Sequence, residues 1–222
     1  HCLHIAGVVL ALVCGLQACQ LDAPCESVSD AELCTYRASA HVEGILAAMT
    51  LEDKVGEMTQ LTLDMLCVGE NHKAEEPHRT DQTRLDSAFA ISKIGSVLNS
   101  AGHSYPAAQW QGLIGDIQAA SMEAKGIPTL YGIDAIHGAT FTYGAALGPQ
   151  QLALAATWDT ALVRVMAEGT AKEIHACGIP WNFAPVLDVG RDPRWPRFWE
   201  TFGEDPKLVG DMGEAMVRGF QE

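Results

Sequence analysis

The sequence predicts an α/β fold in which helices cover both faces of a parallel β-sheet. From residue 94 onward, short apolar runs alternate with longer amphipathic stretches, which is the order of repeated β-α units. The short runs are apolar throughout rather than at every second position, as expected of strands that are buried on both faces. A doubly wound sheet and a (β/α)₈ barrel both have this pattern.

Spacing and capping residues predict each element in turn. Apolar positions at helical spacing predict a helix over residues 37–49, and Thr50 is the expected N-cap of a second helix that continues to Leu61. Residues 71–86 are rich in His, Glu, Asp and Arg and are expected to form an exposed loop. The remaining elements are strands at 94–98, 129–133 and 182–187, helices at 107–125 and 159–177 closed by Gly126 and Gly178, and a final helix that begins at Asp205-Pro206.

Residues 1–19 have the character of an export signal. They contain no Asp, Glu, Lys or Arg, and residues 5–16 form an unbroken apolar run of 12 residues. Such a run is shorter than the ~20 residues needed to cross a bilayer and has the length of a signal-peptide core. Signal peptides begin with Met and a basic segment, whereas this chain begins with His1 and has its first basic residue at Arg37. We therefore expect a signal peptide whose own start is missing.

The end of this segment, Leu-Gln-Ala-Cys at residues 16–19, resembles a bacterial lipoprotein cleavage site. Cleavage there would leave Cys19 acylated and attached to the membrane. The alternative is ordinary cleavage near Ala18, with Cys19 free or paired. Both alternatives export the protein to the periplasm or out of the cell, where Cys25 and Cys34 are a candidate local disulfide.

Composition and motifs exclude several classes of function. A formal net charge of −14, with 14 Lys and Arg against 28 Asp and Glu, excludes a basic nucleic-acid binder. The chain has no Cys-x-x-Cys or His-x-x-x-His spacing, so neither a metal site nor another cofactor is expected. The motifs of nucleotide-binding proteins and of serine hydrolases are missing as well.

Functional side chains of parallel α/β proteins gather at the carboxyl ends of the strands. Asp134 comes one residue after the expected strand at 129–133. A carboxylate accepts hydrogen bonds from two hydroxyls of a polyol, a guanidinium donates to the same hydroxyls, and aromatic rings offer apolar faces for stacking. Asp134 together with an Arg is therefore a candidate sugar-binding site. Around the strand at 182–187, Arg and Trp are concentrated at Trp181, Arg191, Arg194, Trp195, Arg197 and Trp199.

Structural roles are open for these residues. Asp134 could cap the turn after its strand, and Asp188 and Asp192 are more typical of turn-formers than of catalysts. The arginines could pin a long loop by pairing with acidic residues, and we favour that role for Arg191 and Arg194. The acidic residues available for such pairing are Glu200, Glu204 and Asp205.

Four ordered segments of the chain carry a family resemblance. They are MTLEDKVGEMTQL at 49–61, IPTLYGIDAIHG at 127–138, PQQLALAATWD at 149–159 and NFAPVLDVGRDPRWPRFWETFGEDP at 182–206. Together they resemble glycoside hydrolase family 3, the group of β-glucosidases, β-xylosidases and exo-glucanases, over about residues 40–222. The resemblance implies the N-terminal (β/α)₈ barrel domain of that family. It also implies that Asp134 binds the non-reducing-end glycosyl unit in the innermost subsite and that Arg197 reaches the same sugar.

The residues after Asp134 resemble the glucosidase branch of the family. The N-acetylglucosaminidase branch typically carries an acidic residue and a Gly pair there, where this chain has Ala-Ile-His-Gly. We expect His137 to pack or to form a hydrogen bond rather than to act as a base. Gly148 and Pro196 depart from the family pattern. Because Pro fixes φ and lacks an N–H, the loop that carries Arg197 could differ from the family's.

The reaction of the family is a retaining hydrolysis, in which one carboxylate attacks the anomeric carbon and an acid protonates the leaving oxygen. The family's nucleophile is an Asp on a later strand, after a Lys-His pair, and its acid/base often comes from a following domain. No match to either occurs up to Glu222, so we expect both downstream and expect this chain to be inactive alone.

The resemblance thus implies hydrolysis of terminal non-reducing β-D-glucosyl residues of glucosides or oligosaccharides. A non-catalytic surface sugar-binding protein is the alternative. A barrel lyase or aldolase would need a Schiff-base Lys or a metal cluster at a strand end, which the sequence does not place.

Residues 20–36 mix Pro, Ser, Asp and Cys without a period and predict a tether, so the folded domain is expected at 37–222. A complete (β/α)₈ barrel has about 250 residues. The sequence therefore predicts the N-terminal portion of an incomplete barrel.

Overall fold

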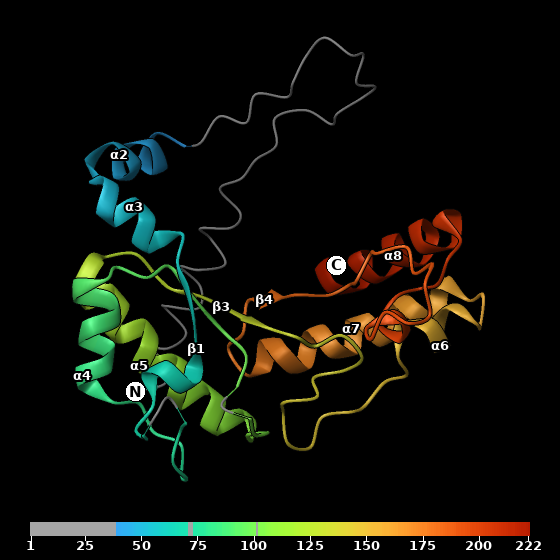
Figure 1. The fold of residues 1–222 in the computed structure, drawn as a ribbon, viewed down its shortest axis with the longest axis horizontal. Coiled ribbons are helices and arrows are strands. Elements are labelled where there is room, and N and C mark those ends of the chain that lie inside the picture. Colours follow the sequence, from blue (N-terminus) through green and yellow to red (C-terminus); the bar gives the residue numbers. More distant parts are fainter. Residues whose placement is uncertain (1–38, 71–72, 101) are drawn as a thin grey trace. The chain divides into compact units, whose positions relative to one another are not determined.

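A computed structural model describes residues 39–70, 73–100 and 102–222 of the chain. They divide into two units, one that ends at Lys54 and one that comprises Val55–Glu222, and the second unit holds the β-sheet (Figure 1). The predicted signal peptide and tether, with Cys19, Cys25 and Cys34, lie outside the described residues. In the part of the chain that the structure describes, no helix is both long enough and apolar enough to cross a membrane.

The first unit contains α2 (Ala40–Ala48) and the beginning of α3 (Leu51–Glu57). Thr50 and Asp53 form a reciprocal capping box at the start of α3. Thr50 Oγ1 accepts a hydrogen bond from the backbone N–H of Asp53 at 3.1 Å, and Asp53 Oδ2 accepts one from the N–H of Thr50 at 3.0 Å. The predicted N-cap at Thr50 is confirmed.

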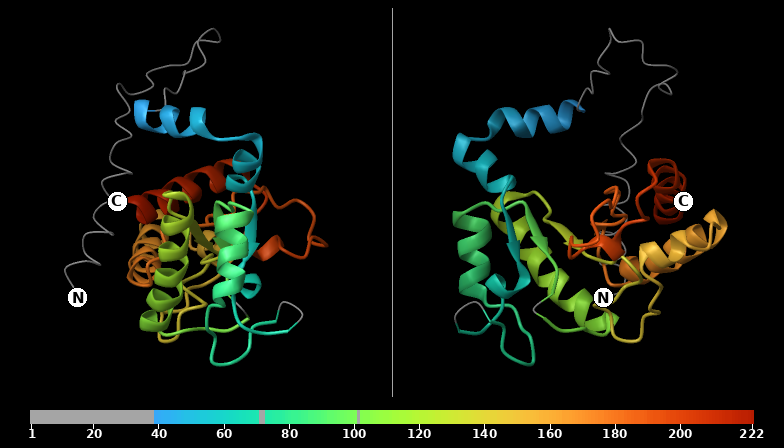
Figure 2. Two further views of the ribbon diagram at one scale, coloured as in Figure 1. Left: turned by 90° about the vertical axis from the view of Figure 1, so that its left-hand side faces the viewer. Right: turned by 45° about the vertical axis from the view of Figure 1, so that its right-hand side comes forward.

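The sheet of the second unit is parallel, as predicted. Its strands are β1 (Gln60–Thr62), β2 (Ser96–Leu98), β3 (Leu130–Ile133) and β4 (Trp181–Asn182). Each strand pairs with the next one along the chain, in the order β1-β2-β3-β4 (Figure 2). The chain therefore winds in one direction, as in a (β/α)₈ barrel, whereas a doubly wound sheet reverses its strand order at a switch point. The strand order favours the barrel.

The sequence does not predict β1, because the second helix was expected to continue to Leu61. Instead α3 ends at Glu57 and the chain pairs with β2. The backbones approach closely here, since a Cβ added at Gly95 would lie 2.0 Å from the backbone oxygen of Glu57. Pairing with a strand that lies far along the chain thus overrides the local helical spacing.

The strand predicted at 182–187 is too long. β4 ends at Asn182, and Pro185 cannot extend a ladder because it has no N–H to donate. The backbone groups of Val186 bond to a side chain instead, since Gln151 Nε2 donates to its oxygen at 2.9 Å and Gln151 Oε1 accepts from its N–H at 3.0 Å. Gln151 is buried, so this side chain replaces a strand partner.

The long helices lie where their capping residues predict. α5 (Ala107–Lys125) ends at Gly126 with φ 67°, and α7 (Thr160–Ala176) is capped by Asp159. α8 (Pro206–Gln221) begins after Asp205, whose side chain accepts from two backbone N–H groups. The sequence does not predict the short elements η1 (Leu63–Leu66), α6 (Gln151–Ala155) and η3 (Phe198–Glu200).

The prediction of an exposed loop at 71–86 is wrong for the second half of that segment. α4 (Gln82–Leu85) and η2 (Asp86–Ile91) follow one another there, and Figure 2 shows them beside α5. Leu85 is 2% exposed and His78 is 6% exposed. This segment has few apolar residues at helical spacing, so its charged residues dominate the sequence pattern. One side of the segment nevertheless packs against α5.

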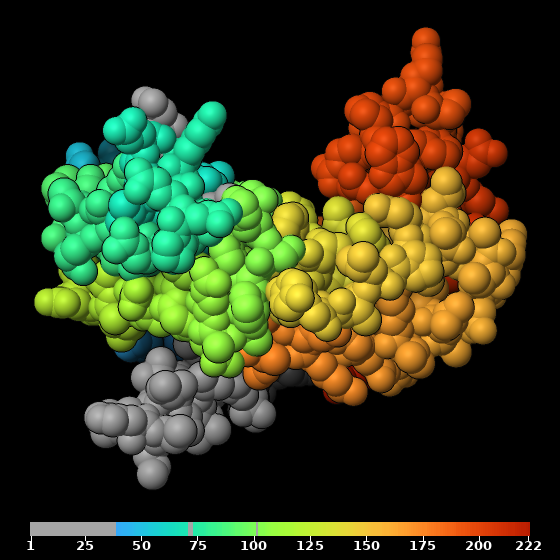
Figure 3. All heavy atoms as spheres, turned by 90° about the horizontal axis from the view of Figure 1, so that it is seen from below, coloured from blue at the N-terminus to red at the C-terminus, as the bar shows by residue number. Residues whose placement is uncertain are grey.

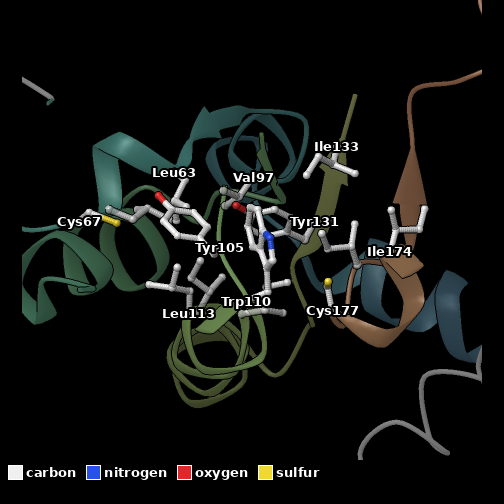
Figure 4. Packing of buried hydrophobic residues seen from close by; sticks show 14 of the residues in the cluster. Leu63, Cys67, Val97, Tyr105, Trp110, Leu113, Tyr131, Ile133, Ile174 and Cys177 are labelled. Atoms are coloured by element: carbon white, nitrogen blue, oxygen red, sulfur yellow. The ribbon is translucent and has the colours of Figure 1, made fainter. Parts of the chain in front are cut away.

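Buried apolar side chains form two cores within the second unit. The first core lies between the sheet, α5 and η2, and its aromatic side chains pack edge to face (Figure 4). The second core lies between α6, α7 and α8. Large members of the first core are Leu63, Phe89, Trp110, Ile117 and Tyr131, and those of the second core are Leu154, Phe202, Met212 and Met216.

Candidate functional site

Three side chains meet at the carboxyl edge of the sheet, where neighbouring strands end. Asn99 follows β2, Asp134 follows β3, and Asn182 is the last residue of β4. Because the strands are parallel and adjacent, their ends lie at the same edge. The structure therefore brings Asp134, the residue predicted to bind a sugar, together with two amide side chains that the sequence does not single out.

Asp134 is partly buried and is held from the β2 side by Asn99. Asn99 Nδ2 donates to Asp134 Oδ2 at 2.8 Å, and Asn99 Oδ1 accepts from the backbone N–H of Asp134 at 3.1 Å. In the described part of the chain, no hydrogen bond reaches the second carboxylate oxygen, Asp134 Oδ1. The carboxylate is thus oriented through one oxygen, and its other oxygen can still accept hydrogen bonds.

From the β4 side, Asn182 holds the residue after Asp134. Asn182 Oδ1 accepts from the N–H of Ala135 at 3.0 Å, and Asn182 Nδ2 donates to the oxygen of Ala135 at 3.2 Å. Asn99 comes directly after the strand predicted at 94–98, so the rule that pointed to Asp134 could have found it. Asn182 is the first residue of the strand predicted at 182–187, so the same rule misses it, and only the early end of β4 places it at a strand end.

Arg197 lies in the loop between β4 and α8, which is orange to red in Figure 3 and stands out from the surface. Its Nε donates to Glu200 Oε2 at 2.7 Å, and its Nη2 lies 2.5 Å from the same oxygen. This hydrogen bond raises the pKa of the Arg197 guanidinium, and the negative charges of Glu200, Asp134 and Asp188 raise it further. Arg197 thus lies within electrostatic reach of Asp134 without a direct hydrogen bond to it.

The loop pairs Arg194 differently from the expectation. Arg194 binds Asp192 through Nε at 3.0 Å and Nη2 at 2.5 Å, rather than Glu200, Glu204 or Asp205. Asp192 Oδ1 also accepts from the backbone N–H of Arg194, so Asp192 forms the turn that was predicted for it. Hydrogen bonds from Arg194 lower the pKa of Asp192. Asp205 is engaged as the cap of α8.

Aromatic rings stand beside the strand ends. Trp181 and Phe183 pack edge to face with their centroids 4.7 Å apart. They lie against the backbone of β3, because a Cβ added at Gly132 would lie 2.3 Å from Phe183 Cζ. Trp181 and Trp199 are 39% and 52% exposed, so both offer apolar ring surface to solvent.

His137 forms a hydrogen bond, as predicted. Its Nδ1 lies 3.1 Å from the oxygen of Gly148, and its own oxygen accepts from the N–H of Gly148 at 2.7 Å. The intervening segment, yellow in Figure 3, lies at the surface between α5 and α7. His137 therefore fixes the base of this segment.

Metal binding has no support in the described residues, where no cluster of three or more His, Cys, Asp or Glu side chains could hold an ion. The site consists of one oriented carboxylate, one guanidinium within electrostatic reach, and exposed rings. Such a set can bind a neutral polyhydroxylated ligand.

Comparison with known proteins identifies related chains. The model of the family described as "Glycosyl hydrolase family 3 N terminal domain" matches residues 50–222. A lysosomal β-glucosidase of Dictyostelium discoideum is 38% identical over 190 residues, which is 81% of this chain and 22% of that protein. A periplasmic β-glucosidase of Salmonella typhimurium is 29% identical over 82% of this chain and 21% of its own length.

Solved structures agree with these relatives. The exo-1,3/1,4-β-glucanase of a Pseudoalteromonas species superposes with a TM-score of 0.68 at 34% identity, over 82% of this chain and 22% of that one. A β-glucosidase of Listeria innocua in complex with isofagomine has a TM-score of 0.63 at 33% identity, over 83% of this chain and 23% of that one. The chain spans about a fifth of the length of the curated relatives that it matches.

Proposed function

The chain belongs to glycosyl hydrolase family 3 through its N-terminal domain, and we propose that it supplies the sugar-binding part of an enzyme that hydrolyses terminal, non-reducing β-D-glucosyl residues. The substrates would be β-glucosides and short oligosaccharides. Relatives named β-glucosidase and exo-1,3/1,4-β-glucanase support this substrate class.

The observation that carries the proposal is the orientation of Asp134 at the carboxyl edge of the sheet. Asn99 occupies Oδ2 of this carboxylate, which leaves Oδ1 to accept a sugar hydroxyl. Arg197, whose guanidinium is anchored by Glu200, would donate to hydroxyls of the same sugar. The rings of Trp181 and Trp199 would cover its apolar faces.

The proposed reaction proceeds with retention of configuration. A carboxylate attacks the anomeric carbon while an acid protonates the departing glycosidic oxygen, and the resulting glycosyl-enzyme bond is then broken by water that the same residue, now a base, deprotonates. Asp134 and Arg197 would bind the sugar in both steps. We assign neither the nucleophile nor the acid/base to any residue of these 222.

Export is part of the proposal. Periplasmic relatives from Salmonella typhimurium and Dickeya chrysanthemi support a location outside the cytoplasm. In this proposal residues 1–19 are the signal peptide, residues 20–36 the tether and residues 37–222 the barrel domain. Acylation of Cys19 stays a prediction from the sequence, as does the pairing of Cys25 with Cys34.

Glucose binding by the 222-residue chain tests the proposal. We expect Asp134→Asn to weaken glucose binding roughly ten- to hundredfold, because hydrogen bonds to charged groups contribute about 1.5–3 kcal/mol. Titration followed by NMR would measure the dissociation constant, with Asp211→Asn on α8 as a control, since Asp211 pairs with Lys207 on that helix. Equal affinities of the Asp134→Asn variant and the parent chain would refute the binding role.

An assay with an aryl β-glucoside addresses the catalytic residues. We expect no turnover above background from this chain, because none of its carboxylates is assigned to catalysis. Turnover that survives purification to homogeneity would mean that the nucleophile is among the carboxylates of this chain.

A further inference from the structure

Asn99 has every polar group of its backbone and side chain bonded to the strand beside it. Its backbone N–H donates to the oxygen of Gly132 at 2.9 Å, and its backbone oxygen accepts from the hydroxyl of Tyr131 at 2.5 Å. Its side chain makes the two hydrogen bonds to Asp134 described above. The residue after β2 is therefore tied to two residues within β3 and to the residue that follows β3.

Tyr131 is a dependable donor in this arrangement. Its ring is fully buried in the first core, and burial raises the pKa of its phenol well above the usual value. The hydroxyl therefore stays protonated and donates to Asn99 at any ordinary pH. Because the ring cannot move without opening the core, the backbone of Asn99 is fixed with it.

The backbone of Asn99 adopts a conformation that few residue types tolerate. Its φ is 55°, in the left-handed region that favours Gly, Asn and Asp. This turn directs the side chain away from the course of β2 and toward the end of β3. A residue with a branched or bulky side chain would be strained at this position.

The chemistry of the two contacts requires a side chain with one donor and one acceptor, which at neutral pH an amide supplies. The N–H of Asp134 only donates, so the Asn99 atom facing it must accept, and the ionised carboxylate only accepts, so the atom facing it must donate. Asn offers one donor and one acceptor at this spacing. Asp offers two acceptors, Ser and Ala are too short, and Gly has no side chain.

We propose that Asn99 is the positioning residue of Asp134: its amide orients the carboxylate so that Oδ1 is aimed at the sugar hydroxyl. This inference rests on the proposed function, because the proposed function is what makes a sugar the ligand of Asp134. Asn99 itself is not required to touch the ligand. Without it, the carboxylate would sample other rotamers and would lose the charge-assisted hydrogen bond that restrains it.

Two substitutions distinguish the role of the Asn99 side-chain amide from the role of its backbone conformation. Asn99→Gly keeps the left-handed turn and removes both side-chain hydrogen bonds. Asn99→Asp keeps the size of the side chain and the acceptor for the N–H of Asp134, but places a second carboxylate beside Oδ2. We expect glucose affinity to fall about tenfold in Asn99→Gly at neutral pH, and to fall further in Asn99→Asp because the two charges repel.

A pH profile distinguishes positioning from a merely structural role. In Asn99→Asp, the nearby charge of Asp134 raises the pKa of the introduced carboxyl. Once protonated, this carboxyl donates to Asp134 as the amide does. We therefore expect the glucose affinity of Asn99→Asp to recover toward that of the parent chain between about pH 7 and pH 5, while Asn99→Gly does not recover. Gln109→Glu, which adds the same charge on α5, is the matched control and should follow the parent chain.

The outcomes separate the inference from the function on which it rests. If Asn99→Gly is folded by circular dichroism and binds glucose like the parent chain, while Asp134→Asn does not, positioning is overturned and sugar binding stands. Absence of acid recovery in a folded Asn99→Asp overturns it as well.

If the parent chain binds no glucose, the proposed function fails and the pairing is judged by NMR. The side-chain amide protons of Asn99 should then respond to the ionisation of Asp134 and lose this response in Asp134→Asn. An identical pH response of the Asn99 amide protons in the parent chain and in Asp134→Asn would overturn the pairing of Asn99 with Asp134.

Discussion

His78 is a buried histidine whose ring stands against two other rings. Its centroid lies 4.8 Å from that of His103 and 5.1 Å from that of Tyr105. Within the described residues, its Nε2 has no hydrogen-bond partner. Burial lowers the pKa of His78, and the charge of His103 lowers it further, whereas Glu76 and Asp64 act in the opposite direction. The folded protein therefore favours the neutral ring.

This predicts a loss of stability in acid. The folded state resists protonation of His78, but the unfolded chain takes up that proton near pH 6.5, so the free energy of unfolding falls as the pH falls below about 6.5. His78→Phe removes the titration and should flatten the decline between pH 7 and pH 5 in urea denaturation. His103→Phe should keep most of it, because the burial of His78 is unchanged. The prediction fails if both variants show the slope of the parent chain.

At the scale of elements, α7 and α8 pack closely because a glycine faces a backbone. A Cβ added at Gly219 would lie 2.4 Å from the backbone oxygen of Arg164 and 2.7 Å from the Cβ of Ala167. Figure 1 shows the two helices side by side. By contrast, a Cβ added at Gly210 of the same helix would meet no atom within 4 Å.

The two glycines of α8 should respond in opposite ways to the same substitution. Gly219→Ala must push the helices apart and should lower the free energy of unfolding by about 1–3 kcal/mol. Gly210→Ala should raise it by about 0.5–1 kcal/mol, because Ala favours the helix and nothing obstructs it. Urea denaturation of both variants measures the difference. Destabilisation by Gly210→Ala of the size expected for Gly219→Ala would contradict the packing argument.

Elements differ in how well the sequence predicts them. α5, α7 and α8 were predicted to within a residue or two, because Gly126, Asp159 and Asp205 act on the nearest turn of their own helix. By contrast, the sequence does not predict β1, and it predicts a strand longer than β4. A strand exists only where another strand pairs with it, and its partner lies far away in the sequence.

At the scale of the whole molecule, the second unit has two cores that share one helix. The N-terminal half of α7 contributes Val163 and Ala167 to the second core, whereas Ile174 near its C-terminus belongs to the first core. Regions with separate cores can open separately. The stability of this unit is therefore not expected to be uniform.

Hydrogen exchange should reveal two regions of different response. Met212→Ala removes a buried side chain of the second core, which costs about 2–5 kcal/mol, and should speed amide exchange in α8 and α6 more than in α5. Ile117→Ala in the first core should do the reverse. Mass spectrometry of exchanged peptides measures both. An equal increase over α5 and α8 in either variant would show a single cooperative unit instead.

The sequence by itself determined the class of the molecule. Apolar runs, capping residues and four ordered motifs predict a parallel α/β barrel domain of family 3, and they select Asp134 as the residue at a strand end. These signals are local, since each lies within one short continuous stretch of the chain.

Only the tertiary structure decided what surrounds Asp134. Asn99 lies 35 residues before it in the chain, and Arg197 is anchored by Glu200 rather than pointing freely into the site. The contact with Asn99 does not follow from spacing, because it depends on which strand ends become neighbours. The pairing of Arg197 with Glu200 is one of the alternatives that the sequence leaves open, and the structure selects it. A carboxylate can be read from the sequence, but its orientation is set by partners that only the pairing of the strands brings within hydrogen-bond distance.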